Sequence, residues 1–285
     1  MNKIKNWSKF VFEQNNIDVL KYFIFDIDDN LLFMETPLHF QHFENGRWIN
    51  KDITTQQFAE IRKKYPNNYM DNSEWKGDPK FSFIEFQDFG PRGTNAFLED
   101  IKKSIKDKKF GPSWEIFLSA IKEGRLFAIV TTRGHEPATL RAGVKYIIDN
   151  VLTPDEKLKM EAKLTSFNQI FGIVTNDLIT QYLGSCFFMG LNSKAFKDEF
   201  NYTPQGDKLN QGKQDAINKF VNFIKEFSKR IDMSVKIGFS DDDKNFSNSA
   251  KELFMNMEKS LDFPEIFYVF DTSNPNIKGG VKVKI

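Results

Sequence analysis

The sequence is poor in cysteine and in long apolar runs. Cysteine occurs once among 285 residues, at Cys186, so an intramolecular disulfide is excluded and a reducing compartment is expected. No apolar run approaches the roughly 18 residues that span a bilayer. The first ten residues carry lysines without the apolar stretch of a signal peptide. These absences predict a soluble, cytoplasmic protein that has no membrane partner.

An excess of either charge is also missing. The chain has 40 basic and 39 acidic residues, a net charge of +1, so no bulk field directs it to nucleic acid or to an anionic membrane. The basic stretch at 102–109 is interpreted as a solvated helix face. With 40% hydrophobic and 28% charged residues, the composition is that of an ordinary globular protein. The length allows one large domain, or a core domain that carries a smaller insertion.

Short apolar runs alternate with helical patterns along most of the chain. The runs predict strands at 20–25, 125–130, 185–191, 234–239 and 266–270. Helices are predicted at 94–106, 112–122, 137–149 and 213–229, and another follows the fourth strand. Strands that alternate with helices predict an α/β fold, a Rossmann-like parallel sheet flanked by helices. Ligands of such sheets bind at the carboxyl edge, which is where polar residues gather in this sequence.

Two of the predicted strands end in clusters of aspartate. The run FIFDIDDNLL places Asp26 and Asp28 at the end of the first strand, and IGFSDDDKNF places Asp241 and Asp242 at the end of the fourth. Neighbouring carboxylates in a sheltered place repel each other and call for a cation. Oxygen ligands without cysteine or histidine favour Mg²⁺. The alternative interpretations are an aspartate-rich turn for the first cluster and a helix N-cap for the second.

Two further residues suit the binding of a phosphate group. Thr131, in AIVTTRG, ends the second predicted strand and could donate a hydrogen bond to a phosphoryl oxygen. Lys213 is predicted at the start of an amphipathic helix, where its charge would add to the helix dipole. A helix N-cap and an exposed surface lysine are the respective alternatives, and each of these two signals is weak alone.

The four signals together resemble the haloacid dehalogenase (HAD) superfamily of phosphatases. Its first motif, D-x-D-x-[TV]-[LI], is matched by Asp26-Ile27-Asp28-Asp29-Asn30-Leu31. Thr131 resembles its second motif, Lys213 (with Lys208 as a second candidate) its third, and the 241–242 pair its fourth. The resemblance departs from the pattern at three places, which are Asn30 in place of Thr, Asp29 in place of Gly, and SDDDKN in place of GDxxxD. Counting four residues on from Asp241 leads to Asn245, so the acid that completes the metal shell stays open.

The resemblance implies a Mg²⁺-dependent phosphate monoester hydrolase. Asp26 would be the nucleophile that forms an aspartyl-phosphate, and Asp28 the general acid and base. Mg²⁺ would be held by Asp26, by the backbone carbonyl of Asp28, and by Asp241 or Asp242. The expected phosphoryl and substrate contacts are Thr131, Lys213, Thr132, Arg133 and Asn30.

The distance in sequence between the first two motifs leaves room for an insertion. Residues 33–92 are a candidate cap or lid, and the predicted HAD-like core comprises 1–32 and 93–285. A second insertion is predicted at 150–184. The aromatic residues of 33–92 could stack on a substrate, but a small separate core is the favoured interpretation. The alternation of Phe81 and Phe83 predicts a half-buried strand.

Three functions compete at this point. The leading one is hydrolysis of a small phosphorylated metabolite or nucleotide. A phosphatase that acts on nucleic-acid ends is the second, and steep salt dependence of oligonucleotide binding would favour it. The third is a catalytically quiet domain that binds a phosphorylated ligand or a protein. The presence of both Asp26 and Asp28 argues against the third function.

Overall fold

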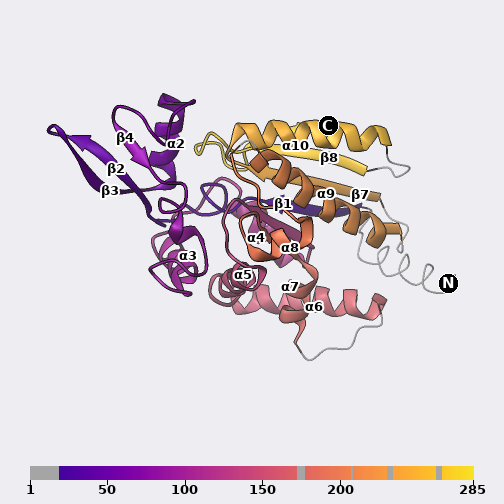
Figure 1. The fold of residues 1–285 in the computed structure, drawn as a ribbon. Coiled ribbons are helices and arrows are strands. Elements are labelled where there is room, and N and C mark those ends of the chain that lie inside the picture. Colours follow the sequence, from indigo (N-terminus) through magenta and orange to yellow (C-terminus); the bar gives the residue numbers. More distant parts are fainter. Residues whose placement is uncertain (1–18, 172–176, 207, 230–233, 261–264) are drawn as a thin grey trace.

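A mostly parallel six-stranded sheet forms the centre of the structure, a computed structural model that describes residues 19–171, 177–206, 208–229, 234–260 and 265–285 (Figure 1). The strand order is β6-β5-β1-β7-β8-β9. The strands are β1 (Val19–Phe25), β5 (Phe127–Thr131), β6 (Phe187–Gly190), β7 (Ser234–Asp241), β8 (Glu265–Asp271) and β9 (Val281–Lys284). Neighbours are parallel except β8 and β9, which are antiparallel. The predicted α/β class is confirmed.

Helices cover both faces of this sheet, and the side chains of β1 alternate between them. Leu20, Tyr22 and Ile24 belong to one hydrophobic cluster, whereas Phe25 belongs to the other. The first cluster includes side chains of α8 (Lys194–Phe200), α9 (Lys208–Lys229) and α10 (Lys244–Ser260). Because both faces are buried, the strands show continuous apolar runs, and these runs made them recognisable in the sequence.

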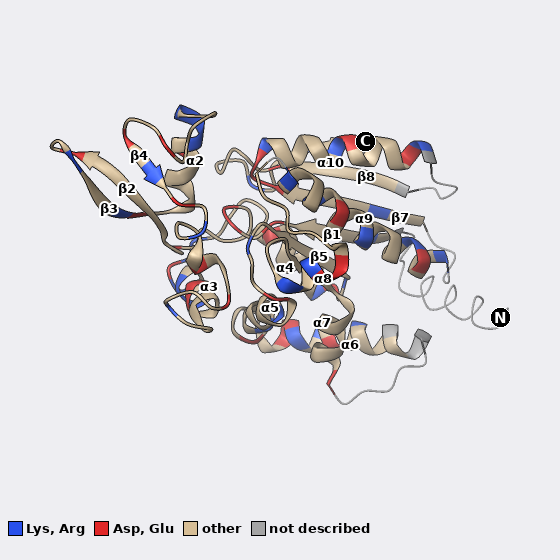
Figure 2. Cartoon of the chain, in the orientation of Figure 1, with Lys and Arg blue, Asp and Glu red and all other residues tan. Residues whose placement is uncertain are grey.

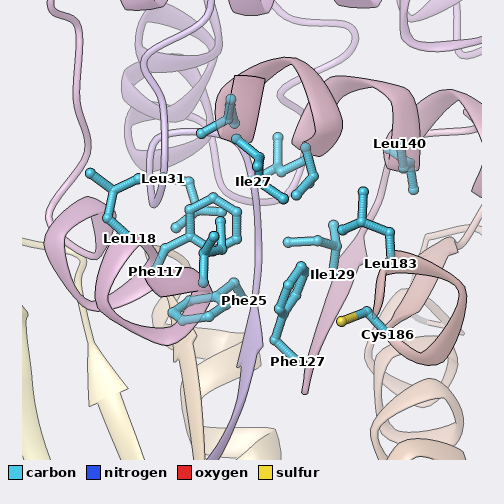
Figure 3. Packing of buried hydrophobic residues seen from close by; sticks show 14 of the residues in the cluster. Phe25, Ile27, Leu31, Phe117, Leu118, Phe127, Ile129, Leu140, Leu183 and Cys186 are labelled. Carbon is cyan, nitrogen blue, oxygen red and sulfur yellow. The ribbon is translucent and has the colours of Figure 1, made fainter. Parts of the chain in front are cut away.

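The second cluster packs five helices against the opposite face. They are α3 (Ala96–Lys106), α4 (Trp114–Lys122), α5 (Pro137–Val151), α6 (Pro154–Phe171) and α7 (Leu178–Ser185). Figure 3 shows Phe117 of α4 beside Phe25 and Phe127, and its ring centroid lies 5.4 and 5.5 Å from theirs. Cys186 is buried in the same cluster as a free thiol. No helix within the described ranges is both long and apolar enough to cross a bilayer.

The predicted strands and helices of the large sheet correspond to observed elements, but helix α8 is not predicted, and two further differences occur. The edge strand β9 is not predicted, because its sequence VKVK is short and mostly exposed. Helix α9 begins at Lys208 and not at 213, so Lys213 lies in its second turn. The described residues leave out part of the predicted core, residues 1–18, and part of the predicted second insertion, residues 172–176.

A second, antiparallel sheet lies apart from the large one, within the segment 33–92 (Figure 1). Its strands, in the order β3-β2-β4, are β2 (Leu38–Glu44), β3 (Arg47–Ile53) and β4 (Trp75–Gly77). The same segment contains helix α2 (Thr55–Lys64) and the 3₁₀ helix η1 (Ile84–Phe86). We call residues 38–86 the small module. Its core is a hydrophobic cluster of its own, built from Leu38, Phe40, Ile53, Ile61 and Phe86 with further aromatic residues around them.

This cluster bears out the interpretation of the aromatic residues as a small separate core. The predicted strand at Phe81 and Phe83 is wrong. The chain forms a turn there and continues into η1, and Phe81 is 57% exposed. Two aromatic residues two positions apart match the period of a strand. The hydrogen bond from the N–H of Ser82 to the carbonyl of Asp78, at 2.7 Å, closes a turn instead.

The small module contacts the carboxyl edge of the large sheet. Arg62 of α2 forms an ion pair of 3.2 Å with Asp243, which follows β7. The N–H of Gly134, beyond the end of β5, donates to the carbonyl of Phe86 at 2.7 Å. The module therefore borders the loops that follow β5 and β7, where the candidate site lies.

Candidate active site

Asp26 and Asp241 come together where β1 and β7 end side by side. Phe25 pairs with Ser240 in the parallel register, and the N–H of Asp26 donates to the carbonyl of Ser240 at 3.0 Å. In the sheet, β1 lies between β5 and β7, so the connections between strands diverge at this point. Ligands of open α/β sheets bind where the connections diverge in this way. Carboxylate oxygens of Asp26, Asp241 and Asp242 all lie within 4.8 Å of one another.

Lys213 reaches into this cluster from α9. Its Nζ lies 3.1 Å from Oδ1 of Asp26 and also donates to Oδ2 of Asp241. The side chain is buried, and Nζ lies 4.0 Å from the centroid of the Phe246 ring. Lys208, the other candidate, is exposed at the first position of α9. Lys213 therefore lies in the cluster and its role stays a prediction, but it lies beyond the first turn of α9, where the helix dipole acts.

The cluster holds three carboxylates beside the single positive charge of Lys213. Burial raises the pKa of Asp26 and of Asp241 above their usual range, and the charge of Lys213 offsets part of each shift. Burial, together with the charges of Asp241 and Asp26, also raises the pKa of Asp242 well above its usual range. For Lys213, burial alone would lower the pKa, but the two carboxylates raise it, so the amine stays charged.

A divalent cation fits this set of donors. The carboxylates supply hard oxygen ligands without a histidine or cysteine in the group, which suits Mg²⁺. The carboxylate of Asp242 is half-buried and has no hydrogen-bond partner among the residues that the structure describes. The carbonyl of Asp28 accepts a hydrogen bond of 2.6 Å from the N–H of Asn30, which leaves its second lone pair for a ligand. Asn245 is exposed in the first turn of α10, so Asp241 and Asp242 are the better placed acids.

The carboxylate of Asp28 lies against a buried arginine. It is bound by Arg133, whose Nε and Nη2 donate to its two oxygens at 2.7 Å each. Arg133 Nη2 also donates to the hydroxyl of Thr36 at 2.8 Å. The guanidinium lies 4.2 Å from the centroid of the Phe86 ring. Arg133 is 1% exposed and orients Asp28, while its Nη1 has no hydrogen-bond partner among the described residues, so the expected substrate contact stays a prediction.

The side chain of Asn30 has no hydrogen-bonding group left for a substrate. Its side chain is fully buried, and its amide hydrogen-bonds to backbone carbonyls and to the hydroxyls of Ser240 and Thr272. The expected substrate contact at this position stays a prediction.

Thr131 lies where the second motif was predicted, at the carboxyl end of β5 beside β1. Its side chain is buried, and its hydroxyl oxygen lies 3.4 Å from the backbone nitrogen of Arg133, which donates to it. Thr132 is half-buried, and its carbonyl accepts a hydrogen bond of 2.7 Å from Asn192. Thr131 is thus on the site edge of the sheet, whereas Thr132 is engaged through its backbone.

Asp29 adopts the left-handed backbone conformation, with φ of 54°. Glycine takes this conformation without strain, which explains why the resembled motif has glycine at this position, and aspartate tolerates it. Burial and the charge of Asp28 raise the pKa of Asp29 to about 7. Asp29 lines a small pocket together with Thr54 and Thr55 of the small module.

Sequence reasoning missed the polar residues beneath the site. Ser240 and Thr272 follow the same rule as the residues that were found, because each lies at or just after the end of a strand. Ser113 is hydrogen-bonded to Ser240 through their hydroxyls and lies before α4. A systematic search for polar residues at all strand ends would have included Ser240 and Thr272, but not Ser113.

Comparison with family models, with curated proteins and with solved structures finds no match to this chain. The functional interpretation accordingly depends on the geometry of the site and on the motifs that it contains.

Proposed function

We propose that this protein is a Mg²⁺-dependent phosphate monoester hydrolase of the HAD superfamily, with Asp26 as its nucleophile. The observation that carries the proposal is the group of Asp26, Asp241 and the half-buried Asp242 beside Lys213, at the carboxyl edge of a parallel sheet. The substrate would be a small phosphorylated metabolite or nucleotide.

The reaction would take place in two steps at Asp26. An oxygen of its carboxylate attacks phosphorus in line, and the bond from phosphorus to the leaving oxygen breaks as the aspartyl-phosphate forms. Asp28 gives a proton to the leaving oxygen and takes one from the water that hydrolyses the aspartyl-phosphate. Arg133 holds the Asp28 carboxylate in one orientation by two hydrogen bonds. Mg²⁺, when bound, supplies positive charge that offsets the repulsion between the carboxylates and the phosphate.

Lys213 and Thr131 would stabilise the transferred phosphoryl group. Lys213 keeps its charge in a buried position and already contacts the nucleophile, so it can neutralise negative charge that builds up on the phosphoryl oxygens. Thr131 presents a hydroxyl from the neighbouring strand.

The small module would act as the lid of this site. It joins the core through residues that touch the catalytic loops, since Phe86 packs on Arg133 and Arg62 pairs with Asp243. A lid at this place would shield the reaction from bulk water.

The charges favour a small substrate over a nucleic-acid end. In the view of Figure 2, lysines and arginines are interspersed with acidic residues on the helices and on the small module. Three of the five lysines in the basic stretch 102–109 form ion pairs, Lys102 with Glu99, Lys103 with Asp107 and Lys109 with Glu35. These pairs support the interpretation of this stretch as a solvated helix face.

Release of phosphate from an aryl phosphate, with and without Mg²⁺, tests the proposal. We expect activity that requires Mg²⁺ and that falls by at least about a thousandfold in Asp26→Asn, because the variant lacks the nucleophile. Asp271→Asn is a matched control, since Asp271 ends the neighbouring strand β8 outside the cluster. Hydrolysis by Asp26→Asn at the wild-type rate would refute the assignment.

A further inference from the structure

The side-chain amide of Asn30 uses its full hydrogen-bonding capacity at the ends of three strands. Its Nδ2 donates to the backbone carbonyls of Asp26 at 3.0 Å and of Ser240 at 3.1 Å. Its Oδ1 accepts from the hydroxyls of Ser240 and Thr272, both at 2.8 Å. A primary amide has two N–H groups and two lone pairs, so none is left for a ligand.

These bonds fix the backbone on both sides of the candidate metal site. The Ser240 carbonyl also accepts from the N–H of Asp26 at 3.0 Å, and the next residue in β7 is Asp241. The N–H of Thr272 donates to the carbonyl of Asp241 at 3.0 Å. One amide group thus connects Asp26 with Ser240, the residue before Asp241, and with Thr272, whose N–H holds the Asp241 carbonyl.

The backbone of Asn30 is itself held in place from the other side. Its carbonyl accepts a hydrogen bond of 3.0 Å from the N–H of Ser113. Gly111 packs so closely that an added Cβ would lie 2.4 Å from the same carbonyl oxygen. Asn30 cannot shift without moving the segment before α4, so it forms a rigid link.

We propose that Asn30 is a positioning residue, which holds Asp26 and Asp241 at the separation that a shared divalent cation requires. This inference rests on the proposed function. Metal ligands depend on outer hydrogen bonds that fix their geometry, and the loss of such a bond typically weakens metal binding about 10- to 100-fold. Asn30 itself touches neither cation nor substrate.

The test compares Asn30→Asp with the wild type. The substitution keeps the size of the side chain but replaces the N–H groups, which face two carbonyls, with an oxygen. We expect the Mg²⁺ concentration for half-maximal activity to rise about 10- to 100-fold. The increase in Tm on adding Mg²⁺ should shrink in parallel, and KM for an aryl phosphate at saturating Mg²⁺ should stay unchanged while kcat falls.

Tyr182→Phe is the matched control for lost stability alone. It removes a hydrogen bond of 2.6 Å from the hydroxyl of Tyr182 to the carbonyl of Arg125, outside the site. It should lower Tm without changing the dependence on Mg²⁺. Should Asn30→Asp fail to fold, Thr272→Val and Ser240→Ala each remove one hydrogen bond to Oδ1 and should shift the Mg²⁺ dependence in the same direction by less.

The outcomes separate this inference from the proposed function. An unchanged Mg²⁺ dependence in folded Asn30→Asp, or in both hydroxyl variants if Asn30→Asp does not fold, overturns the positioning role. A wild type that neither gains Tm with Mg²⁺ nor releases phosphate overturns the proposed function instead.

Discussion

Burial lowers the pKa of both Lys213 and His135, but their charged neighbours act in opposite directions. Lys213 remains charged because two carboxylates contact it. His135 lies against Phe97, at a centroid distance of 4.7 Å, and its Nδ1 has no hydrogen-bond partner within the described part of the chain. Burial and the charge of Arg133 lower the pKa of His135 to about 3. The folded protein therefore holds this imidazole in its neutral form.

His135→Phe should make the protein less sensitive to mild acid. In the unfolded chain the imidazole takes up a proton below pH 6.5, whereas in the folded protein it does so only near pH 3, so stability falls as the pH drops through this range. From pH 7 to pH 5 this group should cost the wild type about 2 kcal/mol of unfolding free energy. Urea unfolding at both pH values measures the difference, and equal losses in wild type and variant would contradict a neutral His135.

The sequence predicts the location of a site residue well when that residue lies at the end of a predicted strand. Asp26, Thr131 and Asp241 were found because each ends a predicted strand. The roles of Asn30 and Arg133 could not be predicted, because their partners are distant in the sequence. Arg133 lies 105 residues from Asp28, and Asn30 lies 242 from Thr272. Such pairings depend on the folded arrangement of the strands.

At the scale of elements, the segment before α4 supports the loop that follows β1 and carries Asp26. Gly111 allows this segment to approach the backbone of Asn30, and its N–H donates to the carbonyl of Leu31 at 2.8 Å. The requirement at Gly111 is for space alone, since a side chain there would meet backbone atoms that cannot move aside.

Gly111→Ala should therefore destabilise the protein by about 1–3 kcal/mol and lower activity, because the added methyl group pushes against the loop that carries Asp26. Gly184→Ala is the opposite case. Gly184 lies in α7 with nothing within 4 Å of an added Cβ, so alanine should stabilise the helix by about 0.5–1 kcal/mol. Denaturant unfolding of both variants tests the contrast, and a Gly111→Ala variant as stable and active as the wild type would contradict it.

Elements are predictable to the extent that their hydrophobic pattern is regular. Strands buried on both faces gave clear apolar runs, whereas the exposed edge strand β9 did not. The start of α9 was placed five residues late, because its first residues, KLNQG, lack apolar periodicity. In the small module, two aromatic residues at strand spacing belonged to a turn and a 3₁₀ helix.

At the scale of the whole molecule, the site depends on the strand order. The alternation of strands and helices predicted a parallel sheet, but β1 had to lie between β5 and β7 for Asp26 to meet Asp241 and Lys213. The contacts between the small module and the core could not be predicted from the sequence. They join Arg62 to Asp243 and Phe86 to Gly134, pairs without a local pattern.

The most direct test of the account is detection of a phosphoryl group on Asp26 during turnover. The wild type would be mixed with an aryl phosphate and Mg²⁺, quenched rapidly in acid, and digested for mass spectrometry. We predict that the peptide containing Asp26 carries the added mass of one phosphoryl group, and that this signal is lost in Asp26→Asn or when Mg²⁺ is chelated. Turnover with no phosphorylated Asp26, or with the phosphoryl group on another residue, would contradict the account.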